Sequence, residues 1–169
     1  MAPESPTTIR LEILSRPDLL APVRSMVISM GERFGFDEVE CGHLALAVDE
    51  ALANVIRHAY DDRPDERIWI TISLLESPDR VFRIEIEDEG EQCDLESITS
   101  RDLEDVRPGG LGVHLMREVT DRCLHEHRSP RGSKVTLEKI PTGTSGGSLT
   151  SSSNDDTGNE SGSSHRHRN

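Results

Sequence analysis

The sequence predicts a two-layer α/β sandwich, in which a mixed but mostly antiparallel sheet is covered on one face by about three helices. Short stretches in which every second residue is apolar predict strands with one buried face. Longer stretches with apolar residues three and four positions apart predict the helices that cover that face. Aromatic residues make up only 3% of the 169 residues, so we expect an aliphatic core.

The first half of the chain predicts one strand followed by two helices. Residues 8–14 alternate as a strand does. Asp18 is placed to cap a first helix whose apolar stripe extends to Phe34, and Asp37 is placed to open a second. The stripe of this second helix consists of Leu44, Val48, Ala51, Leu52, Val55 and Ala59. Residues 61–64 contain two aspartates and a proline, which end it.

The second half predicts four strands and a third helix. One apolar strand face consists of Ile68, Ile70, Ile72 and Leu74, and the next of Phe82, Ile84 and Ile86. A glycine-containing loop leads to a helix that starts near Gly112. Two further strands are expected at residues 122–127 and 134–139.

The ends of the chain differ in composition from its middle. We expect residues 8–140 to form one domain after a flexible N-terminus at residues 1–7. Residues 141–169 are rich in Ser, Gly and Asn, with Leu149 as their one large aliphatic residue. Such a segment buries too little apolar surface to offset its chain entropy, so we expect it to be disordered. The two histidines at its end could bind a metal ion, but we interpret them as solvated tail residues.

Charge and cysteine usage exclude several classes of function. The formal net charge of −13 argues against direct binding of nucleic acid or of anionic membrane, because such surfaces need clustered Lys and Arg. The three cysteines form neither a CxxC pair nor a disulfide framework. No run approaches the ~18 apolar residues that span a bilayer. We therefore expect a soluble protein of the cytoplasm.

Polar residues interrupt the second helix at a spacing of four. Glu50, Asn54 and His58 stack on one helical face, beside the apolar stripe and thus at the border of the core. A carboxylate there can act as a general base, and an amide oxygen can ligate Mg²⁺. The alternative is that all three lie on a solvated flank.

Asp88 ends the apolar row of the strand that contains Phe82, Ile84 and Ile86. A buried carboxylate needs hydrogen-bond donors, and an exocyclic amine of a purine suits it. Gly90, two residues later, allows backbone or ligand to approach closely. The alternative is that the strand has already frayed and that Asp88 is a turn residue.

Three glycines, Gly109, Gly110 and Gly112, surround Leu111 at the start of the third helix. Free N–H groups and the helix dipole at such a start suit a phosphate, although the segment has no GK[ST] and is not a P-loop. An ordinary loop-to-helix junction is the alternative. The polar segment 91–108 is interpreted as a mobile lid, with a plain surface loop as the alternative.

Other chemistries have weaker support. No GxSxG motif is present, and the cysteines lack the surroundings of a nucleophile. His125 and His127 share one strand face, which could suggest a metal site. No third ligand is evident, so we expect them to be exposed strand histidines.

In order and approximate spacing, Glu50 with Asn54, Asp88 with Gly90, and Gly109 to Gly112 resemble the N box and the two glycine boxes of the GHKL ATPases. That superfamily binds ATP in the Bergerat sandwich. Within it, the chain most resembles the bacterial anti-sigma-factor serine kinases, through VDEALANVIRHAY, GGLGVHLMREVTDR and the final strand in GSKVTLEK. The resemblance covers roughly residues 8–140.

The resemblance implies a role for each matched position. Glu50 would accept the proton of an attacking serine or threonine hydroxyl, and Asn54 would bind Mg²⁺ on the phosphates of ATP. Asp88 would accept from the adenine amino group, with Ser133 near the adenine. The remaining implied nucleotide-binding residues are His58, Gly90, Gly109, Gly110, Leu111 and Gly112.

The partners that the resemblance implies are a sigma factor and a STAS-domain anti-sigma antagonist, bound by a homodimer. One departure is Gln92, which stands where the family commonly has the second glycine of DxGxG. The leading hypothesis is a Mg·ATP-dependent protein-serine/threonine kinase. The alternatives are a non-catalytic nucleotide-sensing switch that sequesters a partner, and an accessory nucleotide-binding protein that acts on another regulator.

Overall fold

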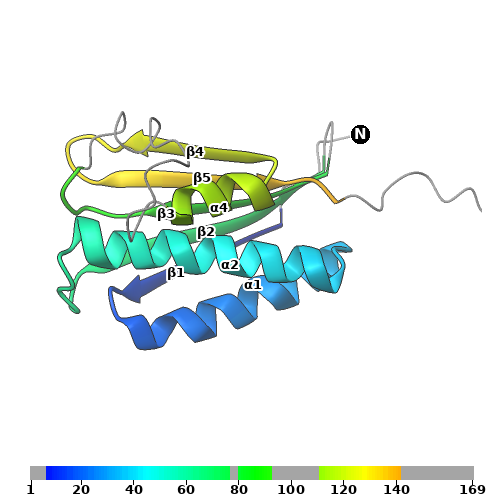
Figure 1. Ribbon diagram of the computed structural model, residues 1–169, viewed down its shortest axis with the longest axis horizontal. Helices are drawn as coiled ribbons and strands as arrows, with labels where there is room; N and C mark the ends of the chain where they lie inside the picture. Colours follow the sequence, from blue (N-terminus) through cyan, green and yellow to red (C-terminus); the bar gives the residue numbers. More distant parts are fainter. Residues whose placement is uncertain (1–6, 77–79, 93–110, 142–169) are drawn as a thin grey trace, which may run out of the picture.

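The computed structural model describes residues 7–76, 80–92 and 111–141 of the chain (Figure 1). Its elements are β1 (Thr7–Leu14), a 3-10 turn η1 (Pro17–Leu19), α1 (Leu20–Phe34), α2 (Glu38–Asn54), a π-helical turn η2 (Val55–Ala59), β2 (Arg67–Leu75), β3 (Val81–Glu87), α4 (Leu111–Val119), β4 (Arg122–His127) and β5 (Ser133–Lys139). Each predicted helix and strand is therefore present. The predicted domain limits at residues 8 and 140 stay predictions.

The strands form one sheet in the order β1-β2-β3-β5-β4. All four pairings among these strands are antiparallel. The expectation of a mixed sheet is thus wrong for the described strands, while the two-layer α/β sandwich is confirmed. Figure 1 shows α1, α2 and α4 together on one side of this sheet, with α2 between the other two.

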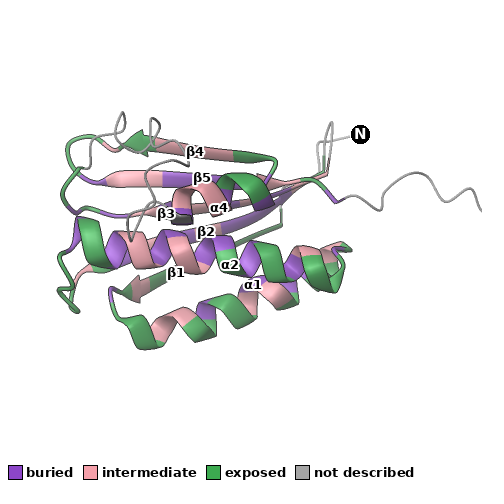
Figure 2. Cartoon of the chain, in the orientation of Figure 1, coloured by how far each residue is buried: buried purple, intermediate pink, exposed green. Residues whose placement is uncertain are grey.

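The core lies between the sheet and the three helices, where Figure 2 shows the buried residues. The sheet contributes Ile68, Ile70, Ile72, Phe82, Ile84, Ile86 and Leu137, none of which is measurably exposed. From α2 and η2 the predicted stripe Leu44, Val48, Ala51, Leu52, Val55 and Ala59 is buried against them. Burial of each large aliphatic side chain stabilises the fold by about 1.5–3 kcal/mol.

The two helix starts follow different rules. Asp37 caps α2 through a capping box, in which its carboxylate accepts from Glu40 N and Glu40 accepts from Asp37 N. The prediction that Asp18 caps α1 is wrong. Pro17 starts a 3-10 turn that contains Asp18, and the Asp18 carboxylate binds the guanidinium of Arg16 at 2.8 Å instead.

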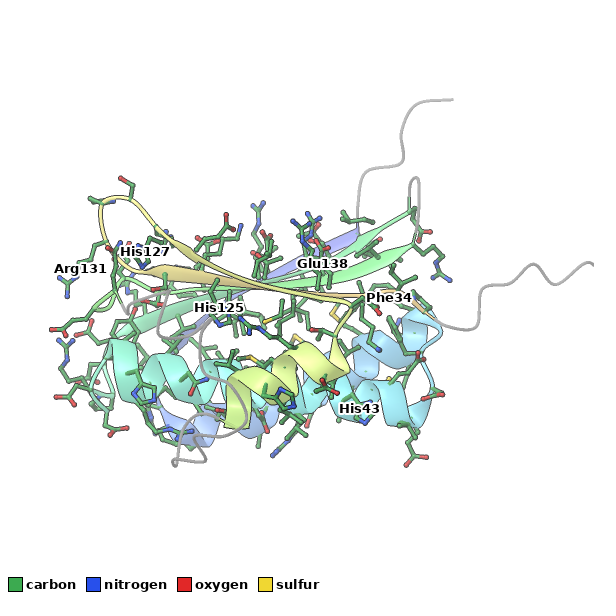
Figure 3. The ribbon with its side chains drawn as sticks, turned by 45° about the horizontal axis from the view of Figure 1, so that its top comes forward. Phe34, His43, His125, His127, Arg131 and Glu138 are labelled. Atoms are coloured by element: carbon green, nitrogen blue, oxygen red, sulfur yellow. The ribbon has the colours of Figure 1, made fainter. Side chains whose placement is uncertain are left out.

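The other face of the sheet carries charged side chains in pairs. Arg83 binds Glu138 at 2.7 Å, and Lys134 binds Glu85. Figure 3 shows Glu138 on the side of the sheet away from the helices and His125 on the helix side. An antiparallel sheet tolerates such a half-solvated arrangement. Within the described ranges, no helix has the length and apolar character to cross a membrane.

Candidate nucleotide-binding site

Glu50 and Asn54 lie one turn apart near the end of α2, and both are half-buried. Their neighbours Ala51, Leu52 and Val55 are buried in the core. This places the two polar side chains at the border of the core, as the sequence predicts, rather than on the fully solvated side of the helix.

His58 lies beyond the end of α2, in the turn η2. After Asn54 the helix widens into the π-helical turn η2, in which Tyr60 N donates to Val55 O at 3.1 Å. His58 is exposed, and the described residues show no polar contact between its ring and the rest of the site.

Gly112, in the first turn of α4, lies directly against the side chain of Glu50. A Cβ atom at position 112 would overlap the Glu50 carboxylate and its Cγ. The glycine therefore allows the start of α4 to reach the helix that carries Glu50 and Asn54. Gly109 and Gly110 lie outside the described residues, and Leu111 is described only as the first residue of α4.

Asp88 follows β3 and is 2% exposed. Its carboxylate oxygen Oδ1 accepts from Gly90 N at 2.8 Å and from Ser133 N at 3.3 Å. Its own N–H donates to Ser133 O at 3.0 Å, so pairing with the β5 side continues beyond the end of β3. The alternative of a frayed, exposed turn residue is wrong, because the carboxylate is buried and held by backbone donors.

Two polar groups remain available beside these bonds. Both hydrogen bonds that the Asp88 carboxylate accepts from the described residues end on Oδ1, which leaves Oδ2 as an acceptor. Ser133 Oγ is buried and has no hydrogen-bond partner there. Burial of an unpaired hydroxyl costs about 1–3 kcal/mol, so a ligand with polar groups at this place offsets that cost.

Burial raises the pKa of the Asp88 carboxyl. The N–H groups of Gly90 and Ser133 and the positive charge of Arg128 oppose this shift. Arg128 also donates to Asp88 O at 2.8 Å and binds Glu87 at 2.9 Å. The sequence did not single out Arg128, because its contacts join the turn after β4 to residues some forty positions earlier in the chain.

Gly90 approaches backbone very closely. A Cβ atom there would overlap the carbonyl of Ala59, the last residue of η2, and Glu91 N donates to that carbonyl at 2.9 Å. The prediction that backbone or ligand approaches Gly90 closely is thus confirmed for backbone, at the carbonyl of Ala59. This approach connects the loop after Asp88 to the element that carries Asn54.

Tyr60 also connects the loop after Asp88 to the end of η2. Sequence reasoning missed this residue. Its buried hydroxyl donates to Arg67 O at 2.5 Å and accepts from Glu89 N at 2.9 Å. Burial raises the pKa of this phenol. The available signal was the residue type, because a buried tyrosine needs a partner for its hydroxyl.

The two strand histidines differ in exposure. His127 is exposed as expected, but His125 is half-buried, so the expectation of two exposed histidines is wrong for it. Burial and the charge of Arg117 on α4 lower the pKa of His125. The described residues contain no cluster of three or more His, Cys, Asp or Glu that suits a metal ion.

Along α2 and η2 these features form one continuous wall. Glu50 contacts the start of α4, and Ala59, nine residues later, contacts the loop after Asp88. At 1.5 Å per residue the two contacts are separated by about 14 Å. A helix start at one end and a hydrogen-bonding carboxylate at the other suit a ligand with an anionic and a heterocyclic end.

Comparisons with known proteins identify the family of the chain. The family model of the histidine kinase-like ATPase domain matches residues 13–139. The chain is 30% identical to the serine-protein kinase RsbW of Oceanobacillus iheyensis over 121 residues, 67% of this chain and 75% of that protein. It is 26% identical to RsbW of Bacillus subtilis over 143 residues, 80% and 86% of the two chains.

A third relative is RsbW of Halalkalibacterium halodurans, 27% identical over 148 residues, 83% of this chain and 87% of that protein. The matches to these relatives thus cover about two thirds or more of each chain, and the family model extends from β1 to β5. The match of the family model to residues 13–139 shows that this protein belongs to the histidine kinase-like ATPase domain family.

Proposed function

We propose that this protein is an ATP-dependent protein-serine/threonine kinase that acts as an anti-sigma factor and phosphorylates a STAS-type anti-sigma antagonist. The observation that carries the proposal is the contact of the Glu50 side chain with Gly112 at the start of α4, with Asn54 one turn away. In this proposal, the catalytic base, the Mg²⁺ ligand and the helix start that binds the phosphates are adjacent. The names of the relatives, serine-protein kinases, support the same activity.

In this proposal the base of ATP lies at Asp88 and Ser133. Asp88 Oδ2 accepts a hydrogen bond from the exocyclic amine, and Ser133 Oγ gains a partner, which it lacks among the described residues. Gly90 and Tyr60 hold the loop that presents Asp88. The phosphates extend toward the start of α4, where Gly112 and the backbone of Leu111 lie. Gly109 and Gly110, outside the described residues, are further phosphate-binding residues in this proposal.

Asn54 is the Mg²⁺ ligand in this proposal. A single amide oxygen suits Mg²⁺, which keeps several waters and is otherwise bound by substrate phosphates. The lack of a carboxylate cluster among the described residues is therefore compatible with a Mg²⁺ site. Mg²⁺ would neutralise charge on the transferred phosphoryl group. The exposed ring of His58 leaves it at most a contact at the rim of the site.

Glu50 is the catalytic base. The hydroxyl oxygen of a serine or threonine on the antagonist attacks the γ-phosphorus of ATP, Glu50 accepts the hydroxyl proton, and ADP leaves. The proton moves to a half-buried carboxylate that the start of α4 holds in place. Such a base contributes about 10²–10⁴ in rate.

The test is label transfer from γ-labelled ATP with Mg²⁺ to a STAS-domain protein from the same organism. We expect transfer by the native protein, and loss of transfer in Glu50→Gln and Asp88→Ala. ATP binding that is lost in Asp88→Ala, without any transfer by the native protein, would contradict the kinase and leave the non-catalytic switch. Absence of ATP binding would contradict both.

The proposal includes a sigma factor as the second partner, a homodimer as the assembly and the cytoplasm as the location. Sedimentation velocity of the free chain, alone and mixed with sigma factors of the organism, measures the first two. A monomer across the accessible concentrations would contradict the homodimer without affecting the kinase reaction.

A further inference from the structure

The side chain of Gln92 makes two hydrogen bonds. The glycine of the DxGxG pattern, which Gln92 replaces, has no side chain to make them. The amide nitrogen Nε2 of Gln92 donates to Arg128 O at 2.9 Å and to Gly132 O at 3.2 Å. Both acceptors belong to the turn between β4 and β5. The side chain of Gln92 is nonetheless exposed, so core packing does not account for its place.

The turn that Gln92 binds is also the turn that holds Asp88. Ser133 N donates to the Asp88 carboxylate, and the Arg128 guanidinium donates to the Asp88 carbonyl. Gly132, with a φ of 91°, passes so close to Asp88 O that a Cβ atom there would overlap it. The carboxylate and the turn therefore form one packed unit.

The opposite side of the loop 88–92 is held by the end of the helix. Glu89 N donates to the Tyr60 hydroxyl, and Glu91 N donates to Ala59 O. Each residue of the loop thus has a hydrogen bond, and Gln92 supplies the last one on the side of the turn. With glycine at position 92, Asp88 would be the one described residue of the loop whose hydrogen bonds connect it to the turn.

We propose that Gln92 is a positioning residue for nucleobase recognition, whose amide fixes the loop 88–92 to the β4–β5 turn so that Asp88 is aligned before nucleotide binds. This inference rests on the proposed function and deepens it, because it concerns the base-recognising end of the same site. Preorganisation of this kind increases affinity by lowering the entropy lost on binding. The departure from DxGxG therefore strengthens base recognition.

The experiment compares ATP with inosine triphosphate, whose base has a carbonyl in place of the exocyclic amine that Asp88 accepts from. The variants are Gln92→Gly, which restores the common glycine, and Gln92→Met, which keeps the length but has no amide. We expect each to raise the Kd of ATP about tenfold, as the loss of one to two hydrogen bonds implies. Binding of inosine triphosphate should change little, so the ratio of the two affinities falls about tenfold.

Arg131→Ala is the matched control. Arg131 lies in the same turn, is exposed, and has no side-chain contact among the described residues; Figure 3 shows it at the end of the molecule. We expect both affinities to stay at the native values. The kcat at saturating ATP should be native in all three variants, since a positioning role at the base affects KM rather than the transfer step.

A measurement without nucleotide separates positioning from general destabilisation. In hydrogen exchange, the amides of Glu89 and Glu91 should exchange faster in Gln92→Gly and Gln92→Met, while amides of β2 and β3 keep native protection. Equal weakening of ATP and inosine triphosphate, or unchanged exchange at these amides, would overturn the inference.

Failure of this inference is distinguishable from failure of the proposed function. If the native protein binds no ATP, the function fails and the Gln92 role fails with it. If the native protein binds ATP and Asp88→Ala abolishes binding, but the Gln92 variants keep the native affinity ratio, only the positioning role is wrong.

Discussion

Asp88 is the residue at which binding and stability oppose each other most directly. Its carboxylate is buried, and burial raises its pKa above the ordinary value of 3.8 despite two backbone donors. The native fold therefore retains a desolvated charge that an apolar or amide side chain would avoid. Such a cost is expected where a group serves a ligand rather than the core.

We predict that Asp88→Asn lowers ATP affinity at least tenfold without lowering the Tm at neutral pH. The folded state binds the Asp88 proton more tightly than the unfolded state does. The stabilisation that comes from this tighter proton binding by Asp88 is thus fully present below pH 3.8. It is lost as the pH rises through the higher pKa of the folded state. The Tm difference, variant minus native, should become more positive across that window. Thermal unfolding measures it, and a difference that falls with pH would contradict the account.

Ser133 gives a second prediction at this scale. Because its buried hydroxyl has no partner among the described residues, Ser133→Ala should leave the free energy of unfolding unchanged or raise it by about 1 kcal/mol. ATP affinity should fall. Chemical denaturation and calorimetric titration check the two parts. A loss of stability beyond about 1 kcal/mol would show that the hydroxyl is hydrogen-bonded in the free protein.

Among the elements, α2 with η2 positions most of the site. Its buried stripe was predictable, because six apolar residues recur at helical spacing, and so was its start at Asp37. The π-helical turn was not, since no local pattern in residues 55–59 favours an i→i+5 bond over an i→i+4 bond.

Gly112 tests the contact between α2 and α4. We predict that Gly112→Ala displaces the Glu50 carboxylate and lowers phosphoryl transfer by a factor on the order of 10² or more. Gly42→Ala in α2 is the control, because a Cβ atom there meets nothing within 4 Å. It should raise the free energy of unfolding by about 0.5–1 kcal/mol and leave transfer unchanged. Native transfer by Gly112→Ala would contradict the assigned contact.

At the scale of the whole molecule, the alternation of apolar and polar residues was enough to predict which face of the sheet is buried, because one side of each strand packs on the core. The same rule placed Asp88 in the buried row. Long-range contacts were beyond local patterns: Tyr60 to Glu89, Gln92 to Gly132 and Arg128 to Asp88 join residues at least 29 positions apart.

The central claim is that Glu50 accepts the proton during phosphoryl transfer. The most direct measurement is the single-turnover rate of transfer from bound Mg·ATP to the acceptor protein, for the native protein and Glu50→Gln, with the Kd of ATP measured on the same samples. We predict a rate lower by about 10²–10⁴ in Glu50→Gln with a native Kd. Equal rates in the two proteins would contradict the account.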